Sequence, residues 1–212
     1  MPPLDKDKIA DLADRARVEL RKRMRALRSA HPERALATRS AQIVERIAEH
    51  PTFTNARSLA LFYPLLERKE VDLRELDARA RALNKRIYYP FMGATPTGFR
   101  TGLALTNSLE DLAERGRRFL EPSPSAPRAA RGDVDLVIVP ALAAAPNGHR
   151  LGYGAGFYDA TLPDFRPPAR ALVVIFDFQL LVELPSLSHD VACDAVVTDR
   201  RTLAVSDPQP SS

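Results

Sequence analysis

The residues of this 212-residue chain that are best suited to chemistry gather in one run, Arg150–Asp159. Three glycines, Gly152, Gly154 and Gly156, leave the backbone free to adopt positive φ and let its N–H groups converge on an anion. Arg150 adds a fixed positive charge before the glycines, and two aromatic residues and an aspartate follow them. A cation, a flexible cradle, a stacking surface and a carboxylate that suits Mg²⁺ therefore lie close together. This combination predicts a phosphate-binding loop.

The glycine spacing alone is a weak signal, because three spaced glycines also mark a tight turn between packed elements. A P-loop would close with Gly-Lys-Ser/Thr, and a dinucleotide fingerprint needs Gly-x-Gly-x-x-Gly, so the run matches neither. The position of the run in the sequence strengthens the prediction of a phosphate-binding loop. The segment Val134–Val139 is nearly all apolar and β-branched, as is typical of a central strand buried on both faces. The loop then lies past the carboxyl end of that strand, where open α/β sheets bind ligands.

Composition limits the class of protein. A 45% hydrophobic content over 212 residues is enough for a full core, and the length favours one domain. The net charge of +4 is mild, because 27 acidic residues are interspersed with 31 basic ones, so no general nucleic-acid footprint is evident. We expect one domain over residues 1–205, with N-terminal helices over residues 1–50, and a disordered tail at residues 206–212.

The cysteine count and the apolar segments point to a cytoplasmic protein without a membrane anchor. Cys193 is the only cysteine, which excludes an internal disulfide and a cysteine-based structural zinc site and favours a reducing compartment. The first residues lack the apolar core of a targeting peptide. The longest apolar stretch, Leu136–Ala145, is interrupted by Pro140 and is too short to span a bilayer. We expect a monomer.

Hydrophobic periodicity predicts an α/β layered domain. The three-to-four spacing of apolar residues over Ile9–Leu27 indicates an amphipathic helix, and Glu33–His50 is typical of a second one. Short apolar segments then alternate with helical ones, which favours a mostly parallel central sheet with helices on both faces, three layers in all. The predicted strands are Ser58–Tyr63, Arg86–Tyr89, Phe99–Leu103, Val134–Val139, Ala171–Phe176 and Ala195–Val197, and the further helices are Leu73–Leu83 and Phe157–Leu162.

With these elements in place, the chain resembles the 5-formyltetrahydrofolate cyclo-ligases, also called methenyltetrahydrofolate synthetases. The block Arg150-Leu151-Gly152-Tyr153-Gly154-Ala155-Gly156-Phe157-Tyr158-Asp159 is highly specific to that family. Supporting marks occur in the family's order. They are an Arg-rich N-terminal helix, Leu59–Tyr63 with Pro64, Glu70-Val71-Asp72, Glu121-Pro122, Val139-Pro140 with Leu142-Ala143, His189-Asp190 and Val197-Thr198-Asp199.

The resemblance implies an activity and its participants. It implies conversion of 5-formyltetrahydrofolate to 5,10-methenyltetrahydrofolate with ATP and Mg²⁺, releasing ADP and phosphate. The partners it implies are small molecules, a reduced folate and ATP, with no nucleic acid and no membrane. Phosphorylating the formyl oxygen turns a poor leaving group into phosphate, after which ring closure can proceed. The protein contributes mainly positioning and electrostatics.

The resemblance also implies residue roles. Catalysis is expected of Arg150 and Tyr153, with Tyr153 near the formyl group. The residues expected to bind ATP are Arg17, Arg150, Leu151, Gly152, Tyr153, Gly154, Ala155, Gly156, Phe157 and Tyr158. The folate is expected to contact Tyr63, Glu70 and Tyr153, with the Glu70 carboxylate on the pterin ring. Asp159 and Asp190 match the Mg²⁺ carboxylates, whose hard oxygens suit that ion.

Some positions depart from the family pattern. Ala13 stands where the family usually has a Lys, and Arg15 or Arg21 is a candidate substitute. Ala144-Ala145 replaces the common Phe-Asp, and Ala160 replaces an Arg. These departures keep open an alternative, a non-catalytic or altered-substrate nucleotide- or folate-binding paralogue.

Purely structural interpretations of some of these residues also remain open. Asp159 alone would be read as a helix-start residue, and Glu70 as a charge before the helix at Leu73. An RNA-associated module is a more distant alternative, because the Arg-rich helix lacks interleaved aromatic residues.

Overall fold

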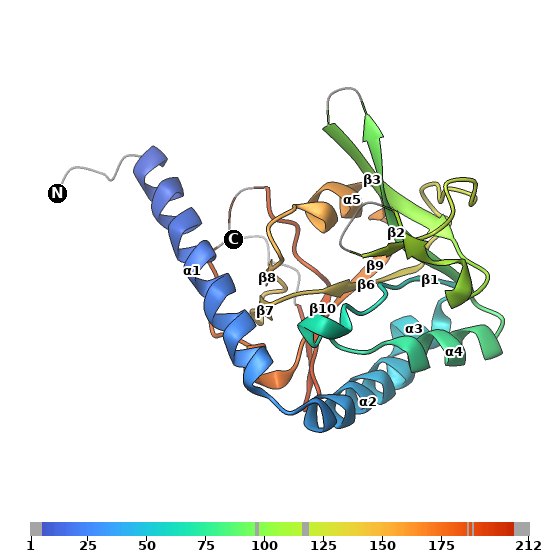
Figure 1. Ribbon diagram of the computed structural model, residues 1–212, viewed down its shortest axis with the longest axis horizontal. Helices are drawn as coiled ribbons and strands as arrows, with labels where there is room; N and C mark the ends of the chain where they lie inside the picture. Colours follow the sequence, from blue (N-terminus) through green and yellow to red (C-terminus); the bar gives the residue numbers. More distant parts are fainter. Residues whose placement is uncertain (1–5, 96–97, 116–118, 186, 188, 206–212) are drawn as a thin grey trace, which may run out of the picture.

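A seven-stranded sheet forms the centre of the molecule (Figure 1), and five of its strands are parallel. The computed structural model describes residues 6–95, 98–115, 119–185, 187 and 189–205, so the tail predicted at 206–212 lies outside the described residues. The strand order is β11-β10-β9-β6-β1-β2-β3, and β3 and β11 run antiparallel to their neighbours. The α/β class with a mostly parallel sheet is therefore confirmed.

The sheet strands are β1 (Ser58–Ala60), β2 (Arg86–Thr95), β3 (Gly98–Leu105), β6 (Leu136–Pro140), β9 (Arg170–Val174), β10 (Ala195–Val197) and β11 (Thr202–Ala204). Two small hairpins pair β4 (Ala113–Glu114) with β5 (Leu120–Glu121) and β7 (Ala143–Ala144) with β8 (Arg150–Leu151). The α-helices are α1 (Lys6–Ala30), α2 (Glu33–Glu49), α3 (Pro51–Asn55), α4 (Arg74–Ala82) and α5 (Phe157–Phe165). Short 3-10 turns are η1 (Leu66–Arg68), η2 (Leu109–Asp111) and η3 (Asp177–Gln179).

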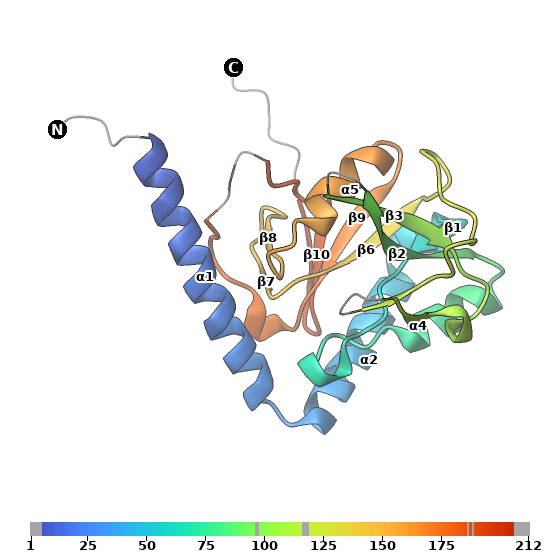
Figure 2. The same ribbon diagram turned by 45° about the horizontal axis from the view of Figure 1, so that its top comes forward.

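Alternate residues of each central strand enter two different cores. In β6, Leu136 and Ile138 face the core that is closed by α2, α3 and α4, whereas Val137 and Val139 face the one closed by α5. This follows from the two-residue period of side chains in a strand. Because both faces are covered, β6 is buried almost throughout, as its β-branched composition predicts. The helices on opposite sides of the sheet make the three predicted layers (Figures 1 and 2).

Helix α1 lies beside this layered body and contacts it through a small third core. Met24 of α1 packs with Leu142, Ala143, Ala145, Leu151 and Leu184, which belong to or flank the β7–β8 hairpin and the segment before Asp190. The C-terminal end of α1 is held by Lys69, whose ammonium donates to the carbonyls of Ser29 and His31, each at 2.8 Å. Lys69 itself has φ 53°. The N-terminal helix therefore lies against the glycine run, as predicted.

All six predicted strands are present, with bounds that differ from the predicted ones most at β1 and β2. β1 ends at Ala60, because the chain leaves the sheet toward η1 after the Leu61 N–H binds the Tyr88 carbonyl. β2 continues past Tyr89 to Thr95 and forms a hairpin with β3. Among the described residues, no helix has the length and apolar content that crossing a membrane requires.

Candidate functional site

The glycine run forms the turn between β8 and α5, and its conformation requires glycine at two positions. Gly154 has φ 105° and Gly156, the N-cap of α5, has φ 65°. A Cβ built at Gly152 or Gly156 meets no atom within 4 Å, so the space above the loop is open. The first N–H groups of α5 lack helical partners and carry the positive end of the helix dipole. This turn fits a phosphate group.

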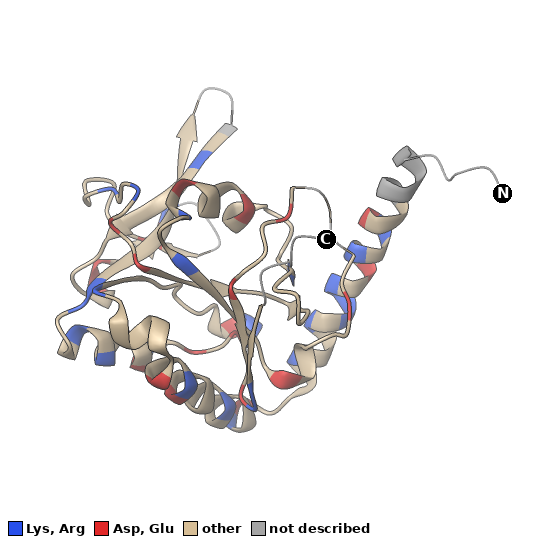
Figure 3. Ribbon diagram, turned by 180° about the vertical axis from the view of Figure 1, so that it is seen from behind, with Lys and Arg blue, Asp and Glu red and all other residues tan. Residues whose placement is uncertain are grey.

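Helix α1 supplies a stripe of arginines to this loop. Arg17, Arg21, Met24 and Arg28 are spaced four, three and four residues apart, so they share one face of the helix. The Arg21 Nε donates to the Gly152 carbonyl at 3.0 Å. Burial lowers the pKa of Arg21, and the nearby cations Arg17 and Arg25 lower it further. Crowded cations of this kind favour an anion between them. Figure 3 shows how Lys and Arg recur along α1.

Arg150 is buried and binds protein groups on the 191–193 segment. Its Nη2 donates to Asp159 Oδ1 at 2.8 Å, and its Nη1 donates to the Val191 carbonyl and lies 3.8 Å from the Cys193 Sγ. The same Asp159 oxygen accepts from the Val191 N–H at 3.1 Å. Arg150 thus joins the start of the glycine run to its end and to the segment that leads into β10.

Asp190 is bound by Arg17 and by its own loop. Arg17 Nη1 donates to Asp190 Oδ2 at 2.5 Å and Nη2 donates to Oδ1 at 3.2 Å, and the Leu187 N–H donates to Oδ2 at 2.8 Å. Burial acts to raise the pKa of Asp190, but these donors outweigh it and the pKa falls below its usual value. Arg17 is therefore placed beside the site by an ion pair with one of the predicted metal ligands.

Glu70, Tyr153 and Arg28 meet in a buried network that spans three separated segments. Arg28 is only 3% exposed, and its Nη2 donates to the Tyr153 hydroxyl at 2.5 Å. Glu70 is 7% exposed, accepts from the Leu65 N–H at 2.9 Å and interacts with the Tyr153 hydroxyl, which acts to lower the pKa of Glu70. Burial raises the pKa of Glu70, although the donors and the cations Arg28 and Arg68 oppose this effect. The predicted folate carboxylate and the predicted tyrosine thus lie together.

A ring of cations surrounds Tyr153. The guanidinium carbons of Arg68, Arg28 and Arg25 lie 5.3, 5.7 and 5.9 Å from its ring centroid. Burial raises the pKa of Tyr153, as does the charge of Glu70, so its hydroxyl stays protonated at neutral pH. A cationic ring of this kind fits an anionic or π-rich ligand.

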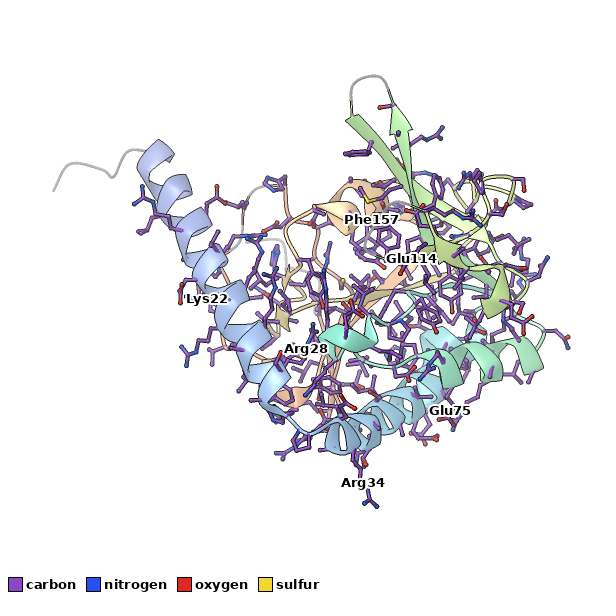
Figure 4. The ribbon with its side chains drawn as sticks, in the orientation of Figure 1. Lys22, Arg28, Arg34, Glu75, Glu114 and Phe157 are labelled. Carbon is purple, nitrogen blue, oxygen red and sulfur yellow. The ribbon has the colours of Figure 1, made fainter. Side chains whose placement is uncertain are left out.

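An aromatic wall adjoins the glycine loop. Phe157, labelled in Figure 4, contacts Phe119 edge-on, with ring centroids 6.1 Å apart. Tyr158 packs against the core under α5, and Leu151 is buried in the small core with Met24, whereas Ala155 is exposed. These residues therefore shape the loop, and its exposed surface is largely backbone.

Tyr63 packs against the core that is closed by α2, α3 and α4, and its hydroxyl interacts with Arg74 at the start of α4. Ala144 and Ala145 are fully buried in the β7–β8 turn, where the small side chains let the hairpin approach the core.

The residues present fit a polyphosphate more directly than a bare cation. Within the described ranges, no three His, Cys, Asp or Glu side chains gather as a metal cluster. Asp159 forms an ion pair with Arg150, and Asp190 forms one with Arg17. Mg²⁺ usually keeps several waters and binds through one or two carboxylates plus substrate phosphates, so a pair of aspartates beside a phosphate loop suits it.

The fold and site define a class of protein. It is an α/β enzyme with a glycine loop at the amino end of a helix and a buried carboxylate nearby. More particularly, the chain belongs to the 5-formyltetrahydrofolate cyclo-ligase family, whose model matches residues 13–199.

Relatives and solved structures agree with this assignment. The chain is 45% identical over 80 residues to a 5-formyltetrahydrofolate cyclo-ligase of Mycolicibacterium smegmatis, a match that covers 38% of this chain and 41% of that protein's length. It is 28% identical over 159 residues to the Escherichia coli K12 cyclo-ligase, covering 74% and 86% of the two chains. The solved 5,10-methenyltetrahydrofolate synthetase of Aquifex aeolicus superposes with a TM-score of 0.77 at 26% identity, over 92% of this chain and 96% of that one.

Sequence reasoning missed several residues of the site. Arg28, Arg68 and Phe119 were not singled out. The signal for Arg28 was present, because it continues the four-three-four spacing of Arg17, Arg21 and Met24 along α1. No comparable signal marks Arg68 or Phe119, which reach the site only through the tertiary fold.

Proposed function

We propose that this protein converts 5-formyltetrahydrofolate to 5,10-methenyltetrahydrofolate with ATP and Mg²⁺, releasing ADP and phosphate. The observation that carries the proposal is the junction at Tyr153. This residue lies within the glycine loop, so a nucleotide phosphate on the loop and a folate at Glu70 would meet beside it. Family membership supports the reaction.

The chemistry requires the two substrates to be aligned. The formyl oxygen attacks the γ-phosphorus of ATP and ADP leaves; the neighbouring folate amine then attacks the activated carbon, and phosphate departs as the ring closes. The N–H groups of the glycine loop and of the first turn of α5 hold phosphate oxygens, and Arg21 adds positive charge above Gly152. Tyr153 orients the formyl group, and Glu70 holds the pterin ring.

Arg150 acts in this proposal by positioning. Because its guanidinium is enclosed by Asp159, Val191 and Cys193, it holds Asp159 at the edge of the loop. Mg²⁺, when bound, neutralises charge on the transferring phosphate. Asp159 and Asp190 are the carboxylates proposed to hold it, and Arg17 releases Asp190 as the phosphates arrive. We also propose that the protein works as a monomer in the cytoplasm, where its single buried cysteine stays reduced.

The direct test follows the absorbance of methenyltetrahydrofolate with 5-formyltetrahydrofolate, ATP and Mg²⁺, together with ADP release. One ADP per methenyl product is expected, and no product with either ATP or Mg²⁺ left out. The alternative function, a binding paralogue, draws on one observation, the alanine at position 13. Saturable binding of both ligands without turnover would select it.

The metal assignment has a separate test. Asp159→Asn keeps an acceptor for Arg150 but removes the negative charge, so we expect a higher Mg²⁺ requirement and a loss of kcat of about a hundredfold, the scale of several kcal/mol of charge stabilisation. Steady-state rates over a Mg²⁺ titration measure both. Wild-type kinetics in this variant would remove Asp159 from the metal site.

A further inference from the structure

We propose that Arg28 is a positioning residue: it fixes the Tyr153 hydroxyl so that the phenolic proton points to Glu70, and thereby keeps the Glu70 carboxylate available to the pterin ring. The proposal rests on the proposed function only in naming the pterin as the ligand of Glu70.

The direction of the hydrogen bonds follows from the chemistry of the groups. A guanidinium has five N–H donors and no acceptor, so the Tyr153 oxygen must accept the bond from Arg28 Nη2. The single phenolic proton is then available to the third member, Glu70, whose carboxylate is an acceptor. Arg28, Tyr153 and Glu70 thus form a one-way chain of donors from α1 across the glycine loop to the segment after η1.

The surroundings make Arg28 a fixed group. It is 3% exposed, and its Nε is buried with no hydrogen-bond partner among the described residues. An unpaired buried guanidinium N–H is costly, so the other contacts of Arg28 must offset this cost. The same end of α1 is also bound by Lys69, which donates to the carbonyls of Ser29 and His31, one and three residues after Arg28. Figure 4 places Arg28 on the side of α1 that faces the body of the protein, with Lys22 on the outer side.

The charged and titratable groups that act on Glu70 come from four elements. Tyr153 donates from the glycine loop, Arg28 and Arg68 contribute positive charge from α1 and η1, and Tyr158 lies in α5. Arg28 is the one among them that acts twice, through its own charge and through the tyrosine hydroxyl. Removing it leaves Glu70 buried with fewer stabilising partners, so the carboxyl group should hold its proton to higher pH.

The first experiment reads this effect without any substrate. In protein labelled with ¹³C-glutamate, the Glu70 carboxyl signal is assigned by its absence in Glu70→Gln and titrated by NMR. We expect it to titrate at higher pH in Arg28→Gln than in wild type. The matched control is Arg34→Gln, which removes an exposed arginine of α2 that points away from the molecule in Figure 4, and it should leave the titration unchanged.

The second experiment uses the reaction. Arg28→Gln should raise the KM for 5-formyltetrahydrofolate at least about tenfold, since it removes a charge-assisted hydrogen bond from the network of Glu70, while the KM for ATP changes much less. The acid limb of the kcat/KM profile for folate should move to higher pH. Arg28→Lys restores one donor and the charge and should recover part of the loss. Tyr153→Phe and the double variant should show non-additive effects, because both single changes break one chain.

The outcomes separate the two proposals. If wild type produces no methenyl product, the proposed function fails, but the Glu70 titration still decides the role of Arg28. If folded Arg28→Gln, judged by its circular dichroism, leaves the Glu70 titration where wild type has it, Arg28 does not act on Glu70 and the inference is overturned. If Arg28→Gln does not fold, the folded Arg28→Lys and Tyr153→Phe variants carry the test by the same titration.

Discussion

At the scale of single residues, burial of the Glu70 carboxylate should lower the stability of the fold, although the proposed ligand binding uses the ionised form. Its burial raises the carboxyl pKa, which means that the folded protein disfavours the ionised form that ligand binding would use. The backbone N–H of Leu65 and the tyrosine hydroxyl recover only part of the lost hydration. A group held in this way is expected at a binding site, because structure alone would favour a neutral side chain.

Glu70→Gln should therefore stabilise the fold while it weakens folate binding. A raised folded-state pKa means that the favourable contribution of Glu70 is fully present below the unfolded-state pKa and is lost as pH rises through the folded-state pKa. The variant should match wild type in acid and exceed it in Tm from about neutral pH upward. Thermal unfolding at several values between about pH 4 and about pH 8 measures the difference. A constant offset across that range would contradict the ionisation argument.

The arginine stripe on α1 makes a second residue-scale prediction. Arg21 already lies on the glycine loop, so of the two candidate substitutes we expect it to take the place of the cation that Ala13 lacks. Arg21→Gln should raise the KM for ATP about tenfold, on the scale of one charge-assisted hydrogen bond. Ala13→Lys should change it less than about twofold. Initial rates against ATP concentration check both. A strong gain from Ala13→Lys would show that the missing lysine had not been replaced.

At the scale of elements, the short turn η1 positions the end of α1. Lys69 follows η1 in the left-handed region, and this unusual backbone directs its side chain to the carbonyls of α1. Because Glu70 comes directly after Lys69, the anchor and the carboxylate are placed by the same turn.

Lys69→Met should lower the free energy of unfolding by about 1–2 kcal/mol, since it removes two charge-assisted hydrogen bonds at a partly exposed site. It should also raise the KM for folate, because the helix end that carries Arg28 loses its anchor. Urea unfolding and folate kinetics measure the two effects. The control is Lys22→Met, which changes an exposed lysine of α1. Unchanged folate kinetics would mean that η1 does not set the position of Arg28.

The same elements show what the sequence could predict. The central strands and amphipathic helices were predictable because burial imposes periods of two and 3.6 residues on their side chains. The β7–β8 hairpin was not, because Ala143–Ala144 and Arg150–Leu151 are too short to show any period. In the site, the glycine run was predictable because its residues are adjacent in the sequence. The contacts of Glu70 with Tyr153 and of Arg17 with Asp190 depend on chain crossings that no local pattern encodes.

At the scale of the whole molecule, the site lies between two bodies of unequal stability. The sheet is covered on both faces, whereas α1 is attached through the small core around Met24 and through ion pairs and hydrogen bonds to the loops. Elements with few apolar contacts open at lower free energy than the core. The arginines that face the glycine loop thus belong to the element that should open more easily, so ligand binding and helix docking should strengthen each other.

The contact between Arg150 and Cys193 gives this molecule a built-in reporter. Cys193 is the only thiol, and burial raises its pKa, so in the closed protein it should resist alkylation. We expect reagent to reach it when the segment of residues 191–193 separates from Arg150, so that the rate of labelling measures how often the site opens. ATP should slow labelling and Asp159→Asn should accelerate it, as mass spectrometry would record. Labelling at equal rates in all three samples would mean that the thiol is exposed by a motion unrelated to the loop.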